Sequence, residues 1–153
     1  MAVDSTGNIF VAGSTDGRLD GNTNAGSWDI FLTKWNSDGT KAWTRQWGTS
    51  SRDYGNSVVI DNSGNIFVVG ATGGHLDGNI SAGDMDIFVT KWNLDGTKAW
   101  SKQWGTDGSD YGNSVAIDDS GNMFITGYSS GDFDGNTNAG FTDIFLTKWT
   151  IVD

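Results

Sequence analysis

Oxygen-bearing side chains surround a glycine in the stretch Asp20–Trp35, which reads DGNTNAGSWDIFLTKW. Asp20, Asn22, Asn24 and Asp29 would offer carboxylate and amide oxygens, which are the ligands that calcium prefers in proteins. Three features argue against a calcium loop. The glycine lies one position later than in an EF-hand, each loop start carries a single charge, and no Glu closes the site. A set of Asx-turns explains the same residues without a metal, so we expect no metal and no cofactor.

The same set of polar residues recurs twice along the chain. Its counterparts are Asp77, Asn79, Ser81 and Asp86 in the second copy, and Asp134, Asn136, Asn138 and Asp143 in the third. The copies begin at residues 20, 77 and 134, which gives a period of 57 residues (77 − 20 and 134 − 77). Self-similarity at a fixed period of this length is typical of repeat architectures, so the repeat decides the fold.

Catalytic chemistry has little support in the sequence. The single histidine, His75, is replaced by Arg18 and Asp132 in the other copies, which is typical of a solvated loop. Asp53 and Asp110 recur, but a residue repeated in every copy is more often scaffold than active site. No nucleophile and base can be paired. We therefore expect no enzyme. A hydrolase is the alternative from the enzyme class, and an activity screen with Asp53→Asn and Asp110→Asn tests it.

Variation between the copies is concentrated in the loop that precedes each DIF strand. Loops on a rigid scaffold carry function more often than the framework does, so these positions form the predicted binding surface for a protein or glycan. The candidate binding residues are Trp28, Met85, Phe141, Arg18, His75 and Asp132. Neutral drift of exposed loops explains the same variation equally well.

The composition favours a β-protein without nucleic-acid or lipid partners. The chain has 23 Gly, 8 Trp, no Pro and no Cys, and its 19 acidic residues are all Asp. Asp, Asn and Gly favour turns, and no window has helical periodicity. A net charge of −10 argues against binding to nucleic acid or to an anionic membrane. No apolar run is long enough to span a membrane, and the N-terminus does not resemble a signal peptide.

Each period predicts four antiparallel strands in a meander. In the second copy the strands are expected at Ser57–Asp61, Ile66–Gly70, Asp86–Trp92 and Lys98–Trp104, with a polar loop over Ala71–Asp84. Turns rich in Gly, Asn and Asp separate them. The chain is therefore expected to be all-β.

The strand patterns indicate how these meanders pack. The runs SVVI and IFVV are apolar at consecutive positions, so both faces of those strands must be covered. The fourth strand alternates instead, with Trp43, Arg45 and Trp47 on one face, and Trp100, Lys102 and Trp104 repeat this stripe. Inner strands covered on both faces and a half-exposed outer strand describe a propeller blade. We interpret the stripe as packing between blades with a cation–π contact, rather than as a ligand platform.

Much of the chain resembles a known repeat family. The pattern D-x-S-G-N-I-F-V-x-G, followed by LDGNxxAGxxDIF[LV]TKW and DGTKAWxxQWGTxxxDYGNS, is similar to the SBBP repeat, named for seven-bladed β-propellers. The resemblance implies a four-stranded blade without catalytic activity of its own. It also implies a bacterial or archaeal surface or secreted protein, hence an extracellular or cell-surface location.

The period divides the chain into one domain (residues 1–153) of about 2.7 blades, since 153 residues cover fewer than three periods of 57. The blades are expected at about 2–48, 56–105 and 113–151, and the third lacks its outer strand. After Trp149 the expected Asn-x-Asp-Gly turn is replaced by Thr150–Asp153, which we interpret as a genuine chain end.

The predicted function is a non-enzymatic interaction or structural module for surface-associated binding, adhesion or assembly through the variable loops. The alternative is a calcium-stabilised, lectin-like glycan binder. Three blades alone would leave two apolar faces in water, and the strand Asp143–Trp149 would be an uncovered edge. We therefore expect a homo-oligomer. A dimer that pools six blades in a closed ring is favoured over a strand-swapped or filamentous assembly.

Overall fold

A computed structural model describes residues 1–150 and contains three antiparallel β-sheets. The first sheet has the strands β1 (Ala2–Val3), β2 (Ile9–Thr15), β3 (Asp29–Trp35) and β4 (Lys41–Trp47). The second has β5 (Asp53–Ile60), β6 (Ile66–Thr72), β7 (Asp86–Trp92) and β8 (Lys98–Trp104). The third has β9 (Asp110–Ile117), β10 (Asn122–Ser129) and β11 (Asp143–Thr150). The only helical element within the described residues is a 3-10 turn, η1 (Leu76–Gly78). The all-β antiparallel prediction is confirmed.

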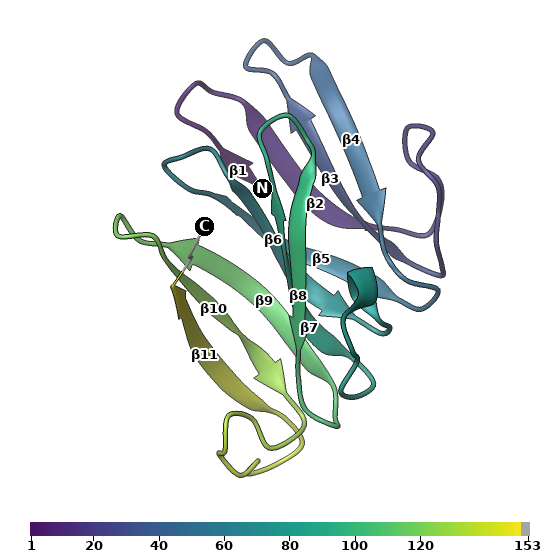
Figure 1. Cartoon of the computed structure of the whole chain (residues 1–153), viewed down its shortest axis with the longest axis vertical. Coiled ribbons are helices and arrows are strands. Elements are labelled where there is room, and N and C mark those ends of the chain that lie inside the picture. Colours follow the sequence, from purple (N-terminus) through teal and green to yellow (C-terminus); the bar gives the residue numbers. More distant parts are fainter. Residues whose placement is uncertain (151–153) are drawn as a thin grey trace.

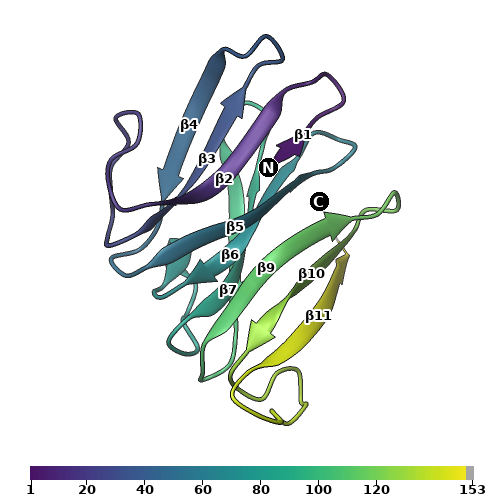
Figure 2. The ribbon, with the colours of Figure 1, turned by 180° about the vertical axis from the view of Figure 1, so that it is seen from behind.

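The strands follow one another in chain order within each sheet, so every connection is a hairpin or a longer loop between neighbours. The three sheets stand side by side and pack face against face (Figures 1 and 2). Strand β5 contacts β2 of the sheet before it and β9 of the sheet after it. This is the arrangement expected for consecutive propeller blades.

Two hydrophobic cores lie between the sheets. The first contains Phe10 and Leu32 from the first sheet and Val68 and Phe88 from the second. The second core joins the second and third sheets. Strands β6 and β7 are buried at every position because both of their faces meet a neighbouring sheet. These strands carry consecutive apolar residues because a neighbouring sheet covers each of their two faces, as predicted.

The aromatic stripes of the fourth strands join neighbouring sheets. Trp47 of β4 meets Trp92 of β7 with ring centroids 4.8 Å apart. The guanidinium of Arg45 lies 5.2 Å from the Trp43 ring centroid, and its Nε donates to the carbonyl oxygen of Gly96 in the second sheet at 2.8 Å. The interpretation of this stripe as inter-blade packing with a cation–π contact is confirmed.

The first strand of the second sheet starts at Asp53, earlier than its predicted start at Ser57. A β-bulge explains the difference, because the pairing with β6 shifts register between Gly55 and Ser57. The bulged residue, Asn56, donates from Nδ2 to the carbonyl oxygen of Gly112 in the third sheet at 3.0 Å. The bulge interrupts the alternation that marks a strand, and it redirects an amide towards the next sheet.

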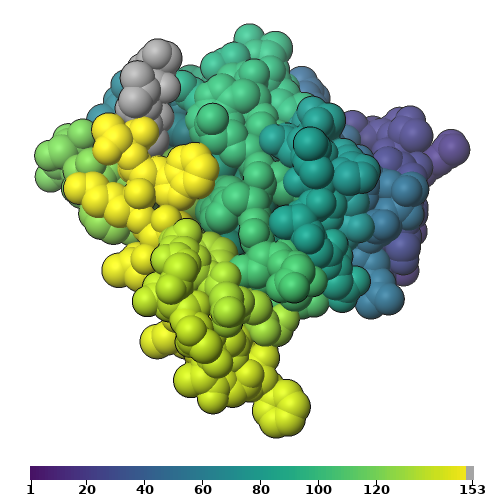
Figure 3. All heavy atoms as spheres, turned by 60° about the horizontal axis from the view of Figure 1, so that its bottom comes forward, coloured from purple at the N-terminus to yellow at the C-terminus, as the bar shows by residue number. Residues whose placement is uncertain are grey.

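The last sheet leaves an uncovered face and an uncovered edge. Ile144 and Leu146 are 93% and 67% exposed, whereas Ile87 and Val89 at the equivalent positions are 0% and 1% exposed. Strand β11 pairs with β10 only, and the loop between these strands projects from the molecule (Figure 3). No helix within residues 1–150 is long and apolar enough to cross a membrane.

Candidate functional site

The candidate site is the loop that joins the second and third strands of each sheet. In all three loops an Asp-Gly pair adopts positive φ, with φ of 51° at Asp20, 50° at Asp77 and 51° at Asp134. Asp is one of the few non-glycine residues that tolerates this conformation. In the first two sheets the aspartate side chain of this turn meets the fourth strand.

A glutamine of the fourth strand holds each complete loop. In the second sheet the Leu76 N–H donates to Oε1 of Gln103 at 2.9 Å. The Gln103 Nε2 donates at 2.8 Å both to the carbonyl oxygen of Gly74 and to Oδ2 of Asp86. Gln46 makes the same three contacts in the first sheet. The sequence analysis did not predict this role. Gln recurs at the same place in both fourth strands, and this recurrence could have indicated it.

The aspartate of each complete loop is also held by the fourth strand. Lys41 Nζ lies 2.6 Å from Oδ1 of Asp20, and the Thr44 hydroxyl donates to Oδ2 at 2.6 Å. These hydrogen bonds, from Lys41 first and then from Thr44, lower the pKa of Asp20. In the second sheet Lys98 and Ser101 bind Asp77 in the same way.

These contacts bear directly on the calcium hypothesis. The Asn22 amide donates its N–H to the carbonyl oxygen of Leu19, and the Asn24 amide donates to that of Asp16. Both amides therefore act as donors that close the loop through backbone carbonyl oxygens. Among residues 1–150 no group of three or more His or Asp side chains is arranged to hold a metal ion.

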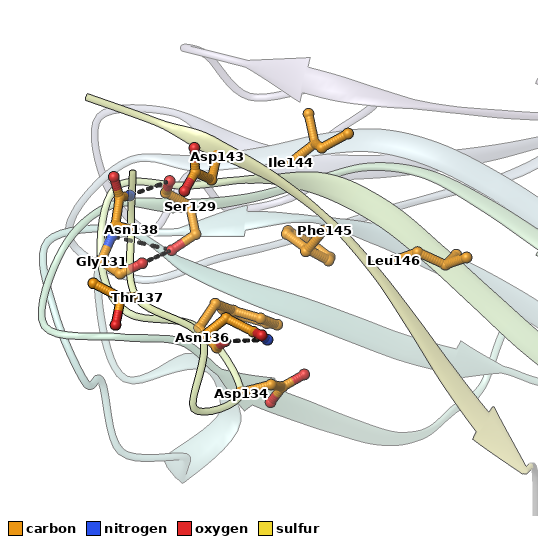
Figure 4. A pocket seen from close by; sticks show the side chains of 11 residues that line it. Ser129, Gly131, Asp134, Asn136, Thr137, Asn138, Asp143, Ile144, Phe145 and Leu146 are labelled. Carbon is orange, nitrogen blue, oxygen red and sulfur yellow. Dashed lines mark hydrogen bonds between the residues drawn. The ribbon is translucent and has the colours of Figure 1, made fainter. Parts of the chain in front are cut away.

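The third loop keeps the same turn although the described part of the third sheet has no fourth strand. Asn136 Nδ2 donates to the carbonyl oxygen of Phe133 at 3.2 Å, and the Ala139 N–H donates to Oδ2 of Asp143 at 2.6 Å. A cavity of about 350 Å³ opens between this loop and β11, lined by Asp134, Asn136 and Asp143 among others (Figure 4). It lies where Gln46 and Gln103 reach into the other two loops.

The variable positions Arg18, His75 and Asp132 are all exposed. His75 Nδ1 accepts a hydrogen bond from the Ser81 N–H at 2.9 Å, and Asp132 Oδ1 accepts one from the Asn138 N–H at 2.8 Å. The same position thus closes the loop in the second and third copies with different side chains. His and Asp can both accept this hydrogen bond, whereas Arg18 of the first copy cannot, so the acceptor is used in two of the three loops.

The three apolar candidates differ in exposure, at 38% for Trp28, 6% for Met85 and 97% for Phe141. The backbone of Met85 pairs with Ser109 at the start of the third sheet, and the Asp110 N–H donates to its carbonyl oxygen at 2.7 Å; Trp28 makes the equivalent pairing with Arg52. Phe141 has no following sheet within the described residues to cover it. The high exposure of Phe141 therefore follows from its place in the last described sheet.

A second cavity, of about 270 Å³, lies at the end of the sheets where these loops meet. Arg52, Tyr54, Asp84, Met85 and Tyr111 line it together with small residues of neighbouring loops. Burial raises the pKa of Tyr111, and nearby Tyr128 adds to the effect, so this phenol is a neutral hydrogen-bond donor at physiological pH. Tyr54 and Tyr111 were not predicted as site residues because the strands that carry them start earlier than the pattern indicates.

The recurring Asp53 and Asp110 are buried anchors between the sheets. Asp53 accepts hydrogen bonds from the Thr49 N–H at 2.6 Å and from the Thr72 hydroxyl. Burial raises the pKa of Asp53. The hydrogen bonds lower this pKa but do not offset the effect of burial, and the charge of Asp29 raises the pKa further. Asp110 accepts the equivalent bond from Thr106. This environment is that of a scaffold residue.

Comparison with known proteins agrees with this architecture. The family model of the SBBP beta-propeller repeat matches residues 1–20, 42–77 and 99–134, more than half of the chain. The chain is also similar to the regulatory protein FlaEY of Caulobacter vibrioides, with 24% identity over 160 residues that cover 94% of the chain. That alignment spans 17% of the relative's length.

Proposed function

This chain belongs to the SBBP beta-propeller repeat family, and we propose that it is a non-enzymatic interaction module that acts in surface-associated binding, adhesion or assembly. The proposed location is outside the cell or at its surface, as the family resemblance implies. The observation that carries the proposal is the uncovered apolar face of the third sheet, where Ile144 and Leu146 lie at positions that are buried in the other sheets.

The exposed face supports assembly with a further copy. Each large apolar side chain left in water forgoes about 1.5–3 kcal/mol of stabilisation. A whole domain is stable by only about 5–15 kcal/mol, so several uncovered side chains are a substantial loss. Packing of the first sheet of one copy against the third sheet of another would cover them. Two copies would pool six sheets, and the proposed species is therefore a homodimer.

Light scattering at micromolar concentration tests this proposal. The expected mass is twice the 16.3 kDa of the single chain. Leu146→Asp places a charge on the proposed interface and should shift the mass to that of the monomer. Ile80→Asp is the matched control, because Ile80 is also largely exposed, at 82% against 67% for Leu146, but lies in a loop. A well-folded wild-type monomer of 16.3 kDa would contradict the proposal.

A second candidate function is that of a lectin-like glycan binder whose loops are stabilised by calcium. The second cavity favours it, since Tyr54, Tyr111 and Arg52 combine aromatic rings with hydrogen-bond donors. A glycan array probed with and without chelator tests both parts. Signals that disappear with Tyr54→Ala would support glycan binding, and signals that also require calcium would support the stabilised form.

The absence of catalysis stays part of the proposal. The hydrogen bonds from Thr49 and Thr72 that occupy the Asp53 carboxylate support a structural role for it. A broad hydrolase screen on the purified chain tests this. Activity that is lost in Asp53→Asn and Asp110→Asn, while both variants stay folded, would overturn it.

A further inference from the structure

The cavity of about 270 Å³ at the end of the sheets combines one cationic side chain with aromatic rings and hydroxyl groups. We propose that it binds an acidic saccharide, with the carboxylate of the sugar on Arg52 and the sugar ring against Tyr54 and Tyr111. This ligand class rests on the second candidate function, glycan binding, and adds the charge of the ligand and its contacts. The residues of the cavity are distinct from Ile144 and Leu146 of the apolar face.

All three sheets contribute to this cavity. Ser27 lies in the loop before β3 of the first sheet, Arg52 and Asp84 precede β5 and β7 of the second, and Tyr111 lies on β9 of the third. The cavity therefore lies at the boundaries between the described sheets, and it needs neither outer face of the stack.

Positions at which the copies of the repeat differ meet in this cavity. Ser27 corresponds to Asp84, and Arg52 corresponds to Ser109, each at the spacing of 57 residues (84 − 27 and 109 − 52). The tyrosines of β5 and β9 are instead the same in both copies. The repeat thus supplies two aromatic rings, and the differing positions add one cation and one anion. This asymmetry is not required by the packing of the sheets, and it is suited to a ligand with distinct ends.

Arg52 sets the charge of the ligand. Its side chain is exposed, and within residues 1–150 it forms no ion pair and no side-chain hydrogen bond. Its backbone is held, because its carbonyl oxygen accepts a hydrogen bond from the Gly73 N–H at 2.8 Å. A guanidinium presents a planar fork of donors that matches the two oxygens of a carboxylate. The cavity therefore has a fixed site for one carboxylate.

The tyrosines supply the surface for the sugar ring. Tyr111 stacks on Tyr128 with ring centroids 4.9 Å apart and an interplanar angle of 24°, and Tyr54 lies 6.4 Å from Trp28. Each ring is thus supported by a second aromatic residue, so little side-chain freedom is lost when a ligand binds. An aromatic ring with a phenol offers an apolar face to the C–H groups of a sugar and a hydrogen bond to its hydroxyls.

Asp84 distinguishes a hydroxylated acid from a simple anion. Its Oδ2 accepts a hydrogen bond from the Ser109 hydroxyl at 3.1 Å, which holds the carboxylate in place. A carboxylate accepts hydrogen bonds from sugar hydroxyls but repels a second negative charge. The ligand must therefore place its charge at Arg52 and its hydroxyl groups at Asp84, with Ser27 and Ser51 as further hydroxyl partners.

The net charge of −10 is compatible with one bound carboxylate. A nucleic acid requires a basic surface because it carries many phosphates, but a single carboxylate requires one local cation. At physiological ionic strength, exposed charges more than about 8 Å away are largely screened. The contact with Arg52 therefore decides the affinity.

The test compares two probes that differ in charge, trigalacturonate and its methyl ester. Binding to the full chain is measured by isothermal titration calorimetry in EDTA, so that no calcium ion bridges the carboxylates. We expect saturable binding of the acid at one site per chain. The ester should bind at least about tenfold more weakly, because hydrogen bonds to charged groups are the stronger ones.

Variants of the chain give a second readout. Arg52→Gln should lower the affinity for the acid about tenfold and leave the affinity for the ester unchanged, since both changes remove the same contact. Arg52→Lys keeps the charge but loses the fork, so its effect should be smaller. Arg18→Gln is the matched control, because Arg18 is also exposed but does not line the cavity. Tyr54→Ala should weaken both probes by the same factor.

The outcomes separate this proposal from glycan binding itself. Equal affinity for acid and ester, or equal effects of Arg52→Gln and Arg18→Gln, would overturn the acidic class and leave glycan binding standing. An array on which neutral glycans bind and uronic acids do not would have the same meaning. An array without any bound glycan would overturn both. A tripeptide with a free C-terminal carboxylate that binds more tightly than trigalacturonate and requires Arg52 would replace the sugar with a peptide.

Discussion

The indole rings of Trp47 and Trp92 meet edge to face across the first sheet boundary, at 4.8 Å between centroids and an interplanar angle of 62°. Both side chains are buried, and they belong to the fourth strand of one sheet and the third strand of the next. Trp47→Ala should therefore lower the free energy of unfolding by about 3–5 kcal/mol, the usual cost of truncating a buried aromatic residue. Urea denaturation followed by circular dichroism measures the change.

The second sheet boundary supplies the control for this substitution. Trp104 meets Trp149 at 4.7 Å but is only half-buried, because within residues 1–150 no fourth strand covers that end of the third sheet. Trp104→Ala should thus cost less than Trp47→Ala. Equal costs would show that burial at the sheet boundary does not set the contribution of these rings.

Gly48 lies where two buried carboxylates approach each other between the first two sheets. A Cβ at this position would be 2.7 Å from Oδ2 of Asp53 and 2.8 Å from Oδ1 of Asp29. Gly48→Ala should lower the free energy of unfolding by about 1–3 kcal/mol through overpacking. Gly17→Ala is the control, since no heavy atom lies within 4 Å of its Cβ position. A neutral Gly48→Ala in thermal melts would disprove this close packing.

Asp4 makes stability depend on acid pH. Burial raises its pKa, but hydrogen bonds from Asn8 and Thr6 outweigh this effect and bring the pKa from 3.8 down to about 2. A carboxylate with a depressed pKa in the folded state stabilises the fold above its unfolded pKa. This contribution is fully present above pH 3.8 and is lost as the pH falls towards 2.

The melting temperature of Asp4→Asn should therefore lie below that of the wild type at pH 6, and the difference should shrink at pH 2.5. Asp4 is only partly buried, so we expect a shift of a few degrees at most. The exposed Asp16→Asn serves as the reference. A difference between wild type and Asp4→Asn that does not change with pH would contradict the proposed role of the turn hydrogen bonds.

Calcium should be dispensable for folding. Lys41 and Thr44 bind the carboxylate of Asp20, and the neighbouring amides act as donors within the loop. EDTA should therefore leave the melting temperature nearly unchanged. A structural cation present at about 100 times its dissociation constant would add about 2.7 kcal/mol of stability. A drop of many degrees on chelation would restore calcium as a structural ligand.

Most of the sheet architecture was predictable because the repeat presents each strand more than once. The bounds of β7 and β8 were predicted correctly, since Asp86–Trp92 and Lys98–Trp104 are framed by turn residues on both sides. The starts of β5 and β9 were not, because the bulges at Asn56 and Asn113 break the two-residue alternation. Periodicity detects regular strands, and a bulge is a local departure from it.

The candidate site was harder to predict from sequence. Leu76 lies in a loop rich in Gly and polar residues, yet it is fully buried in the first core. The hydrogen bonds of Gln103 join residues that are 17 to 29 positions apart, and no local pattern reveals such a connection. The sequence shows that Gln, Lys and Asp recur at equivalent positions of the copies. The hydrogen-bond partner of each residue became evident only from the register of the strands in the sheet.

The two ends of this stack of sheets are unlike surfaces, since the first carries the short strand β1 and the last carries Ile144 and Leu146. A contact that joins unlike ends is heterologous, so every copy that uses one end still offers the other. Growth stops only if the rotation per copy closes on itself. The angle between successive sheets therefore determines whether copies of this chain form a finite ring or an open-ended fibre, and a small change in that angle would convert one into the other.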